Sequence, residues 1–82
     1  MAAIIVERSF PVPVTDAEIV GFAERQADCL DIYRVIYKRS ILSDDRLRMI
    51  CEYEAADTES VRKVQNEARF PADRVWAGKP LG

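Results

Sequence analysis

The fold follows from residues 35–54, which read Val-Ile-Tyr-Lys-Arg-Ser-Ile-Leu-Ser-Asp-Asp-Arg-Leu-Arg-Met-Ile-Cys-Glu-Tyr-Glu. β-Branched and aromatic residues, the types enriched in strands, stand on both sides of a polar segment at 43–46. The pattern predicts two antiparallel strands joined by a tight turn at Ser43-Asp44-Asp45-Arg46.

This turn predicts which side chains share a face of the sheet, because alternate residues of a strand point to the same side. The more apolar face should lie under helices, with the pairs Leu42 and Leu47, Ser40 and Met49, Lys38 and Cys51, Ile36 and Tyr53. The other face should stay uncovered, with the pairs Ile41 and Arg48, Arg39 and Ile50, Tyr37 and Glu52, Val35 and Glu54.

The segments before and after this hairpin predict two helices and two more strands. Residues 2–10 carry adjacent β-branched residues, which suits a central strand buried on both faces. Thr15-Asp-Ala-Glu18 has the form of a capping box and predicts a helix from Asp16 to Cys29. A second helix should run from a cap at Asp57 to about Arg69, before a short strand at residues 75–76.

The predicted order is β-α-β-β-α-β over a single domain, residues 1–82. Right-handed crossovers in both β-α-β halves place the two helices on one face of a four-stranded antiparallel sheet. This is an α+β, ferredoxin-like sandwich.

Composition excludes several classes of function. A net charge of −2 supplies no basic field for a phosphate backbone, so we expect no nucleic acid partner. No apolar run approaches the roughly 20 residues of a membrane span, and the N-terminus lacks the pattern of a signal peptide, so we expect a cytoplasmic protein. The absence of His removes imidazole from any catalytic or metal site. Cys29 and Cys51 are interpreted as reduced packing residues.

The uncovered sheet face would expose Val35, Tyr37, Ile41 and Ile50. Large exposed apolar patches are rare on monomers, so we predict a homodimer in which this face meets a second copy. A polar cluster of candidate ligand-binding residues, Tyr37, Arg39, Glu52 and Glu54, would then lie between the sheets, with either Glu7 or Arg8 beside it. Such a cluster forms either a network of interface ion pairs or a pocket for a small molecule or metal.

Four stretches of the sequence carry a family resemblance: Val6-Glu-Arg-Ser-Phe-Pro, Arg39-Ser-Ile-Leu-Ser-Asp-Asp-Arg, Met49-Ile-Cys-Glu-Tyr-Glu-Ala-Ala-Asp and Phe70-Pro-Ala-Asp-Arg-Val-Trp. Together they resemble a family of small bacterial ferredoxin-like proteins of unassigned biochemistry that are often described as nickel-binding. The resemblance implies the same fold, a homodimer and a link to nickel. Nickel-binding members would be expected to offer His side chains, and this chain has none, so no metal ligand is carried over to it.

The leading hypothesis is a non-catalytic homodimeric binding protein whose ligand is a small molecule or a divalent metal. The alternative is an enzyme related to small dimeric α/β-barrel oxygenases and isomerases, with Glu52 and Glu54 as acid–base groups and Tyr37 as proton donor. A third hypothesis is a purely structural interaction module. The sequence does not identify a cofactor.

Overall fold

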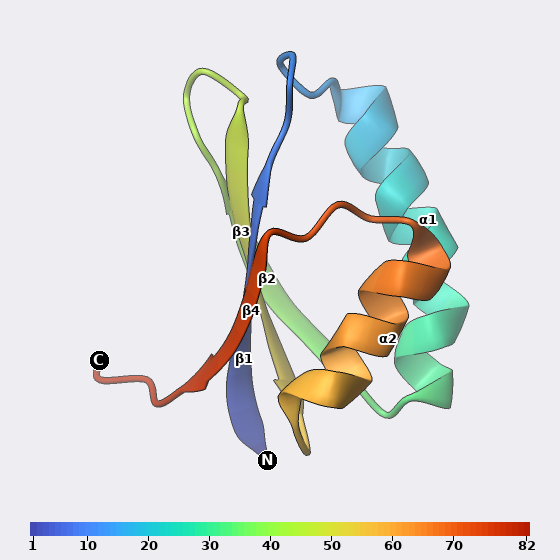
Figure 1. The fold of residues 1–82 in the computed structure, drawn as a ribbon, viewed down its shortest axis with the longest axis vertical. Helices are drawn as coiled ribbons and strands as arrows, with labels where there is room; N and C mark the ends of the chain where they lie inside the picture. The colour runs from blue at the N-terminus through green and yellow to red at the C-terminus, as the bar shows by residue number, and fades with distance from the viewer.

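Four strands form one antiparallel sheet in the order β2-β3-β1-β4 in the computed structural model, which describes residues 1–82. The elements are β1 (Ala2–Ser9), α1 (Asp16–Ile32), β2 (Ile36–Leu42), β3 (Arg48–Ala55), α2 (Thr58–Ala68) and β4 (Arg74–Gly78). Both helices pack on the same side of the sheet, and the other side is bare (Figure 1). The predicted ferredoxin-like arrangement is confirmed, with β1 in a central position.

Both helices begin at the predicted caps. The hydroxyl of Thr15 accepts from the backbone N–H of Glu18 at 3.2 Å, and the Glu18 carboxylate accepts from the N–H of Thr15 at 3.1 Å. Asp57 caps α2 by accepting from the N–H of Ser60 at 2.9 Å. α1 continues three residues beyond the predicted end at Cys29 because no helix breaker follows; it stops before Arg34, whose φ of 56° is left-handed.

The core lies between the sheet and the helices. Its strand residues come mainly from alternate positions of β1 and β3, and α2 adds Val61, Val64 and Ala68. α1 contributes less: Gln26 is its only buried residue, and Phe22, Cys29 and Leu30 are only partly buried against the core. No helix has the length and apolarity of a membrane span.

The predicted turn between β2 and β3 was too short. Leu42 pairs with Met49 rather than with Leu47, so the register differs from the prediction by two residues. The loop includes Leu47 because the Asp45 carboxylate accepts from the Leu47 N–H at 3.0 Å, and because Arg46 has a left-handed φ of 63°. A shift of two preserves the faces, and Met49, Cys51 and Tyr53 are buried under the helices as predicted.

The structure also differs from the prediction by a β-bulge at Lys38. Arg39 pairs with Glu52, whereas Tyr37 pairs with Tyr53, so Lys38 is an extra residue in β2. One extra residue exchanges the faces of everything before it. Val35, predicted on the uncovered face, is therefore buried in the core with 5% exposure, and Ile36, predicted under the helices, is exposed.

Candidate functional site

The bare face of the sheet carries an ion pair among apolar side chains. Arg39 and Glu52 lie opposite each other on β2 and β3, and Nε of Arg39 donates to Oε1 of Glu52 at 3.0 Å. The Glu52 side chain is only 20% exposed, whereas that of Arg39 is 72% exposed. Ile41 and Ile50 pair beside them and remain 59% and 40% exposed. The guanidinium therefore keeps hydrogen-bond donors free beside a largely shielded carboxylate.

A hollow of about 430 Å³ lies over this pair. It is lined by Ile5 of β1, Trp76 of β4, the Arg39 and Glu52 side chains and the C-terminal tail, residues 79–82. The tail leaves β4 on the side away from the helices, so it borders the bare face (Figure 1). A second hollow of about 220 Å³ extends from the same pair toward Ile41 and Ile50. The arrangement can hold a small molecule against a cation, a carboxylate and apolar walls.

The structure brings together only some of the predicted site residues. Glu54 follows Glu52 on the same face of β3, but it pairs with Lys38 at 3.3 Å rather than with Arg39. Tyr37 lies on the opposite side of the sheet because of the bulge at Lys38. Its ring packs edge-on against Tyr53, with centroids 5.7 Å apart.

Tyr37 is therefore separated from Arg39, Glu52 and Glu54, and the placement predicted for it was wrong. The enzyme hypothesis needed Tyr37 as a proton donor beside the two carboxylates. With Tyr37 on the helix side, that constellation does not form.

Glu7 and Arg8, between which the sequence left a choice, point to opposite faces. Glu7 lies on the bare face, where its Oε2 accepts from the indole N–H of Trp76 at 2.7 Å. Arg8 lies under the helices and is only 2% exposed. The alternation of Ile4, Val6 and Arg8 along β1 is the sequence signal that could have placed Arg8 in the core.

Arg8 is a buried cation whose direct partners are all neutral. Its guanidinium donates to Gln65 Oε1 at 2.9 Å, to the Pro71 carbonyl at 2.9 Å, to the Tyr53 hydroxyl at 3.0 Å and to Cys51 Sγ at 3.4 Å. It also lies 3.3 Å from the centroid of the Phe70 ring. No carboxylate forms an ion pair with it. The Arg8 guanidinium therefore has several hydrogen-bond acceptors, but no carboxylate balances its positive charge.

Tyr53 extends this buried network toward α1. Its hydroxyl donates to Oε1 of Gln26 at 3.0 Å. Burial raises the pKa of Tyr53 to about 12, although the charge of Arg8 acts in the opposite direction. The phenol therefore stays protonated at neutral pH and can serve as a hydrogen-bond donor.

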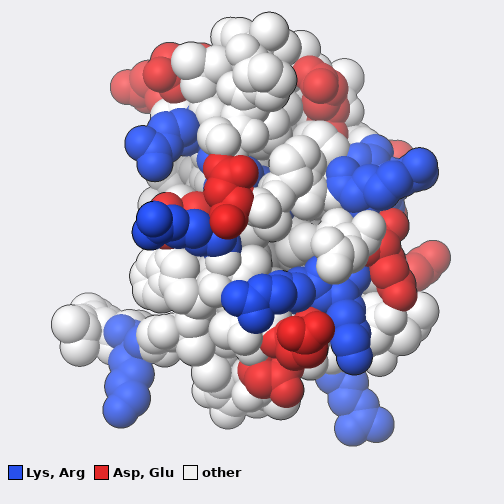
Figure 2. Space-filling model, viewed as in Figure 1, with Lys and Arg blue, Asp and Glu red and all other residues white.

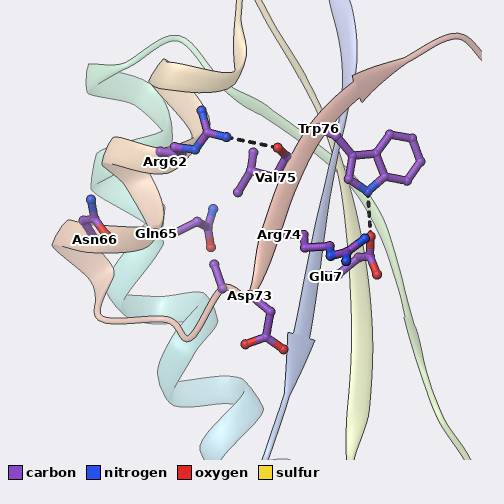
Figure 3. A pocket seen from close by; sticks show the side chains of 9 residues that line it. Glu7, Arg62, Gln65, Asn66, Asp73, Arg74, Val75 and Trp76 are labelled. Atoms are coloured by element: carbon purple, nitrogen blue, oxygen red, sulfur yellow. Dashed lines mark hydrogen bonds between the residues drawn. The ribbon is translucent and has the colours of Figure 1, made fainter.

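A groove of about 800 Å³ separates α2 from β4 (Figure 3). Most of its polar side chains fasten β4 to the rest of the molecule: Arg62 donates to the Val75 carbonyl at 3.1 Å, and Asp73 accepts from the Ser9 hydroxyl at 2.6 Å. Arg62, Arg74, Glu7 and Asp73 mix both signs of charge along it. Figure 2 shows the same mixture of acidic and basic side chains over the side from which Figure 1 is viewed. These contacts hold β4 against α2 and β1, so we interpret the polar side chains of the groove as structural.

The chain does not fit a nickel site on its own. It has no His, and no group of three or more Cys, Asp or Glu side chains is placed to hold a metal ion. Cys51 is buried and accepts from Arg8 and Ser40. Partial burial and the Glu67 carboxylate, 3.5 Å away, raise the pKa of the Cys29 thiol, which disfavours the thiolate that binds metals.

Fold and site together define the class: a ferredoxin-like α+β protein with one bare sheet face and a buried arginine network beneath its helices. A model of the protein family described as "Nickel responsive protein SCO4226-like" matches residues 5–77, and the chain belongs to this family. Among solved structures, SCO4226 from Streptomyces coelicolor A3(2) is similar, with a TM-score of 0.85 and 16% sequence identity over 99% of both chains. That likeness shows a shared fold. No match was found among curated protein sequences.

Proposed function

We propose that this protein is a non-catalytic, homodimeric binding protein whose bare sheet face meets the same face of a second copy. The ligand is held between the two sheets, in the hollow over Arg39 and Glu52. The observation that carries this proposal is the Arg39–Glu52 pair, which lies among exposed apolar side chains on a face that no element covers.

The exposed apolar side chains support the dimer. Ile36, Ile41, Ile50 and Trp76 all lie on the bare side and are 49%, 59%, 40% and 46% exposed. Several large apolar side chains exposed on one face of a sheet favour an interaction surface there. A second copy is the simplest occupant because the face carries both a cation and an anion, so a two-fold axis can set each charge against its opposite.

The hollow supports a ligand of modest size. Its volume of about 430 Å³ falls in the range of small-molecule pockets, roughly 300–1,000 Å³. Arg39 uses Nε for Glu52, which leaves the Nη groups available to an acceptor on the ligand. Glu54 lies beside this site but is engaged by Lys38, so we assign it to the rim. Nickel is not assigned as the ligand, because the side chains of this chain do not fit it.

Light scattering tests the dimer. We expect twice the chain mass of 9.3 kDa at micromolar concentration. Ile50→Lys should give single chains, because it places a charge in the centre of the proposed interface. Ile32→Lys is the matched control, since Ile32 is 68% exposed on α1, and this variant should stay dimeric. A wild-type mass of one chain would contradict the proposal.

Native mass spectrometry of the purified dimer, before and after Glu52→Gln, tests the ligand site. We expect a retained small molecule in the wild type and its loss in the variant, with the dimer intact. If the variant weakens the dimer and leaves the retained mass unchanged, Arg39 and Glu52 are interface ion pairs. A wild-type dimer with no retained mass would remove the pocket from the proposal.

A further inference from the structure

A separate cavity of about 270 Å³ lies on the helix side of the sheet, between α1 and the neighbouring strands β2 and β3. Most of its lining is apolar and includes Ala23 of α1, Met49 of β3 and Phe70. The sheet separates this cavity from the hollow over Arg39 and Glu52, so a ligand bound here is independent of the proposed function.

The cavity exists because the two helices pack differently. α2 buries three apolar residues against the sheet, whereas α1 buries only Gln26. α1 therefore leaves space above β2 and β3 that its own side chains do not fill. The space opens to solvent, because it is bordered by the exposed residues Ala23, Ala27, Tyr37 and Ser40, and a ligand can therefore enter it.

Gln26 and Ser40 are the two polar residues of the lining, and Tyr37 adds a hydroxyl; hydrogen bonds hold all three in place. The Gln26 side chain is held by the Tyr53 hydroxyl, which donates to its Oε1, so the amide N–H groups of Gln26 remain as its free donors. The Tyr37 hydroxyl lies 2.7 Å from the Ser40 hydroxyl, and Ser40 donates to Cys51 Sγ at 3.0 Å. A ligand would meet a donor and a hydroxyl pair inside otherwise apolar walls.

The buried cation Arg8 lies next to the lining of this cavity. Arg8 contacts two lining residues: it donates to Cys51 Sγ and lies against the Phe70 ring. No acidic residue lines the cavity, and no carboxylate pairs with Arg8. Because charges act over longer distances in the low dielectric of a protein interior, this cation favours a negative ligand nearby.

We propose that this cavity binds a small carboxylic acid with an apolar, ring-sized body. The body fills the space between α1 and Met49 and Phe70, and the carboxylate accepts from the Gln26 amide in the field of Arg8. Tyr37, which the bulge turns toward the helices, closes the side formed by β2.

The test is a ¹H–¹⁵N NMR titration of the full chain with sodium benzoate and, separately, with benzyl alcohol, a neutral molecule of similar shape. We expect saturable shifts from benzoate at the amides of Ala23, Met49 and Cys51, and several-fold weaker binding of benzyl alcohol. Ala23→Leu should fill the cavity and weaken benzoate binding about tenfold or more, as expected when a side chain intrudes on an apolar pocket.

Ala17→Leu is the matched control, because it makes the same change on α1 outside the cavity, and it should bind benzoate like the wild type. Each protein's spectrum also reports whether it is folded. Unchanged benzoate binding in the Ala23 variant, shifts confined to Arg39 and Trp76 on the bare face, or no saturable shift would overturn the proposal. Equal binding of benzyl alcohol would overturn the assignment to a carboxylic acid.

Discussion

Arg8 is the residue on which the interior of this protein most depends. Its planar guanidinium joins β1 to Tyr53 on β3, to Gln65 on α2 and to the Pro71 carbonyl, and it stacks on Phe70. A buried charge is tolerated only when its hydrogen bonds are satisfied, and the fork of Arg donors meets that condition with neutral acceptors from several segments. Arg8 therefore organises the packing of both layers.

Arg8→Lys should lower the free energy of unfolding by about 2–3 kcal/mol, because a single ammonium cannot make the same set of hydrogen bonds or stack on Phe70. Urea denaturation measures the change. Arg48→Lys is the control, since Arg48 is exposed on β3, and it should stay within about 0.5 kcal/mol of the wild type. Equal losses in the two variants would contradict the role given to Arg8.

Tyr53 makes stability depend on pH in the alkaline range. Its pKa in the folded protein is about 12, above the ordinary value of about 10. A raised pKa means that the unfolded chain releases the proton first, so the stabilisation is complete below about pH 10 and is lost as pH rises toward about 12.

The free energy of unfolding should therefore fall more steeply above about pH 10 in the wild type than in Tyr53→Phe. The difference in slope approaches about 1.4 kcal/mol per pH unit, the contribution of one proton. Urea denaturation at a series of pH values measures both slopes. Parallel slopes would show that Tyr53 titrates as it does in the unfolded chain.

At the scale of elements, the bulge at Lys38 decides what each face of β2 presents. A regular strand would have placed Tyr37 beside Arg39 on the bare face and Ile36 in the core. The extra residue reverses both, buries Val35 and leaves Lys38 on the bare side with Glu54. The bulge thereby leaves Arg39, Glu52 and Glu54 on the bare face and places Tyr37 alone on the helix side.

Two neighbouring substitutions test the bulge. Val35→Ala should cost about 2 kcal/mol, because it removes buried apolar volume. Ile36→Ala should cost less than about 0.5 kcal/mol, because that side chain is exposed. Thermal or urea unfolding at the same protein concentration compares them. The opposite order would mean that β2 pairs without a bulge.

At the scale of the whole molecule, the sheet is covered by helices on one side only (Figure 1). The two sides therefore differ in composition. The helix side contains the core, the Arg8 network and a small cavity, and the bare side carries an ion pair among exposed apolar residues. Membership of a nickel-responsive family does not by itself supply ligands to this chain, which has no His and no cluster of metal-binding side chains.

We expect that the purified protein retains no stoichiometric Ni²⁺ after incubation with nickel chloride and desalting, because hard carboxylates engaged by Arg39, Lys38 and Trp76 are poor ligands for it. Native mass spectrometry gives the readout directly. Stoichiometric retention of nickel would contradict this expectation and would mean that copies of the chain together provide ligands that one chain lacks.

Local patterns in the sequence were sufficient for the order of elements, both helix caps, the central place of β1 and the buried face of β3. These features depend on residues close together in the chain: a capping side chain reaches three residues ahead, and strand alternation repeats every two. Placement of Glu52 and Glu54 on the bare face followed from the same alternation.

Only the tertiary structure decided the longer loop at residues 43–47, the bulge at Lys38, the burial of Arg8 and the cavity beneath α1. The alternation of apolar and polar residues does not reveal a bulge, and one extra residue in a strand moves every side chain before it to the opposite face. A buried cation is stable only where acceptors from distant segments converge, and a cavity depends on how closely a helix packs. Each of these is a property of contacts between segments, which no single stretch of the chain contains.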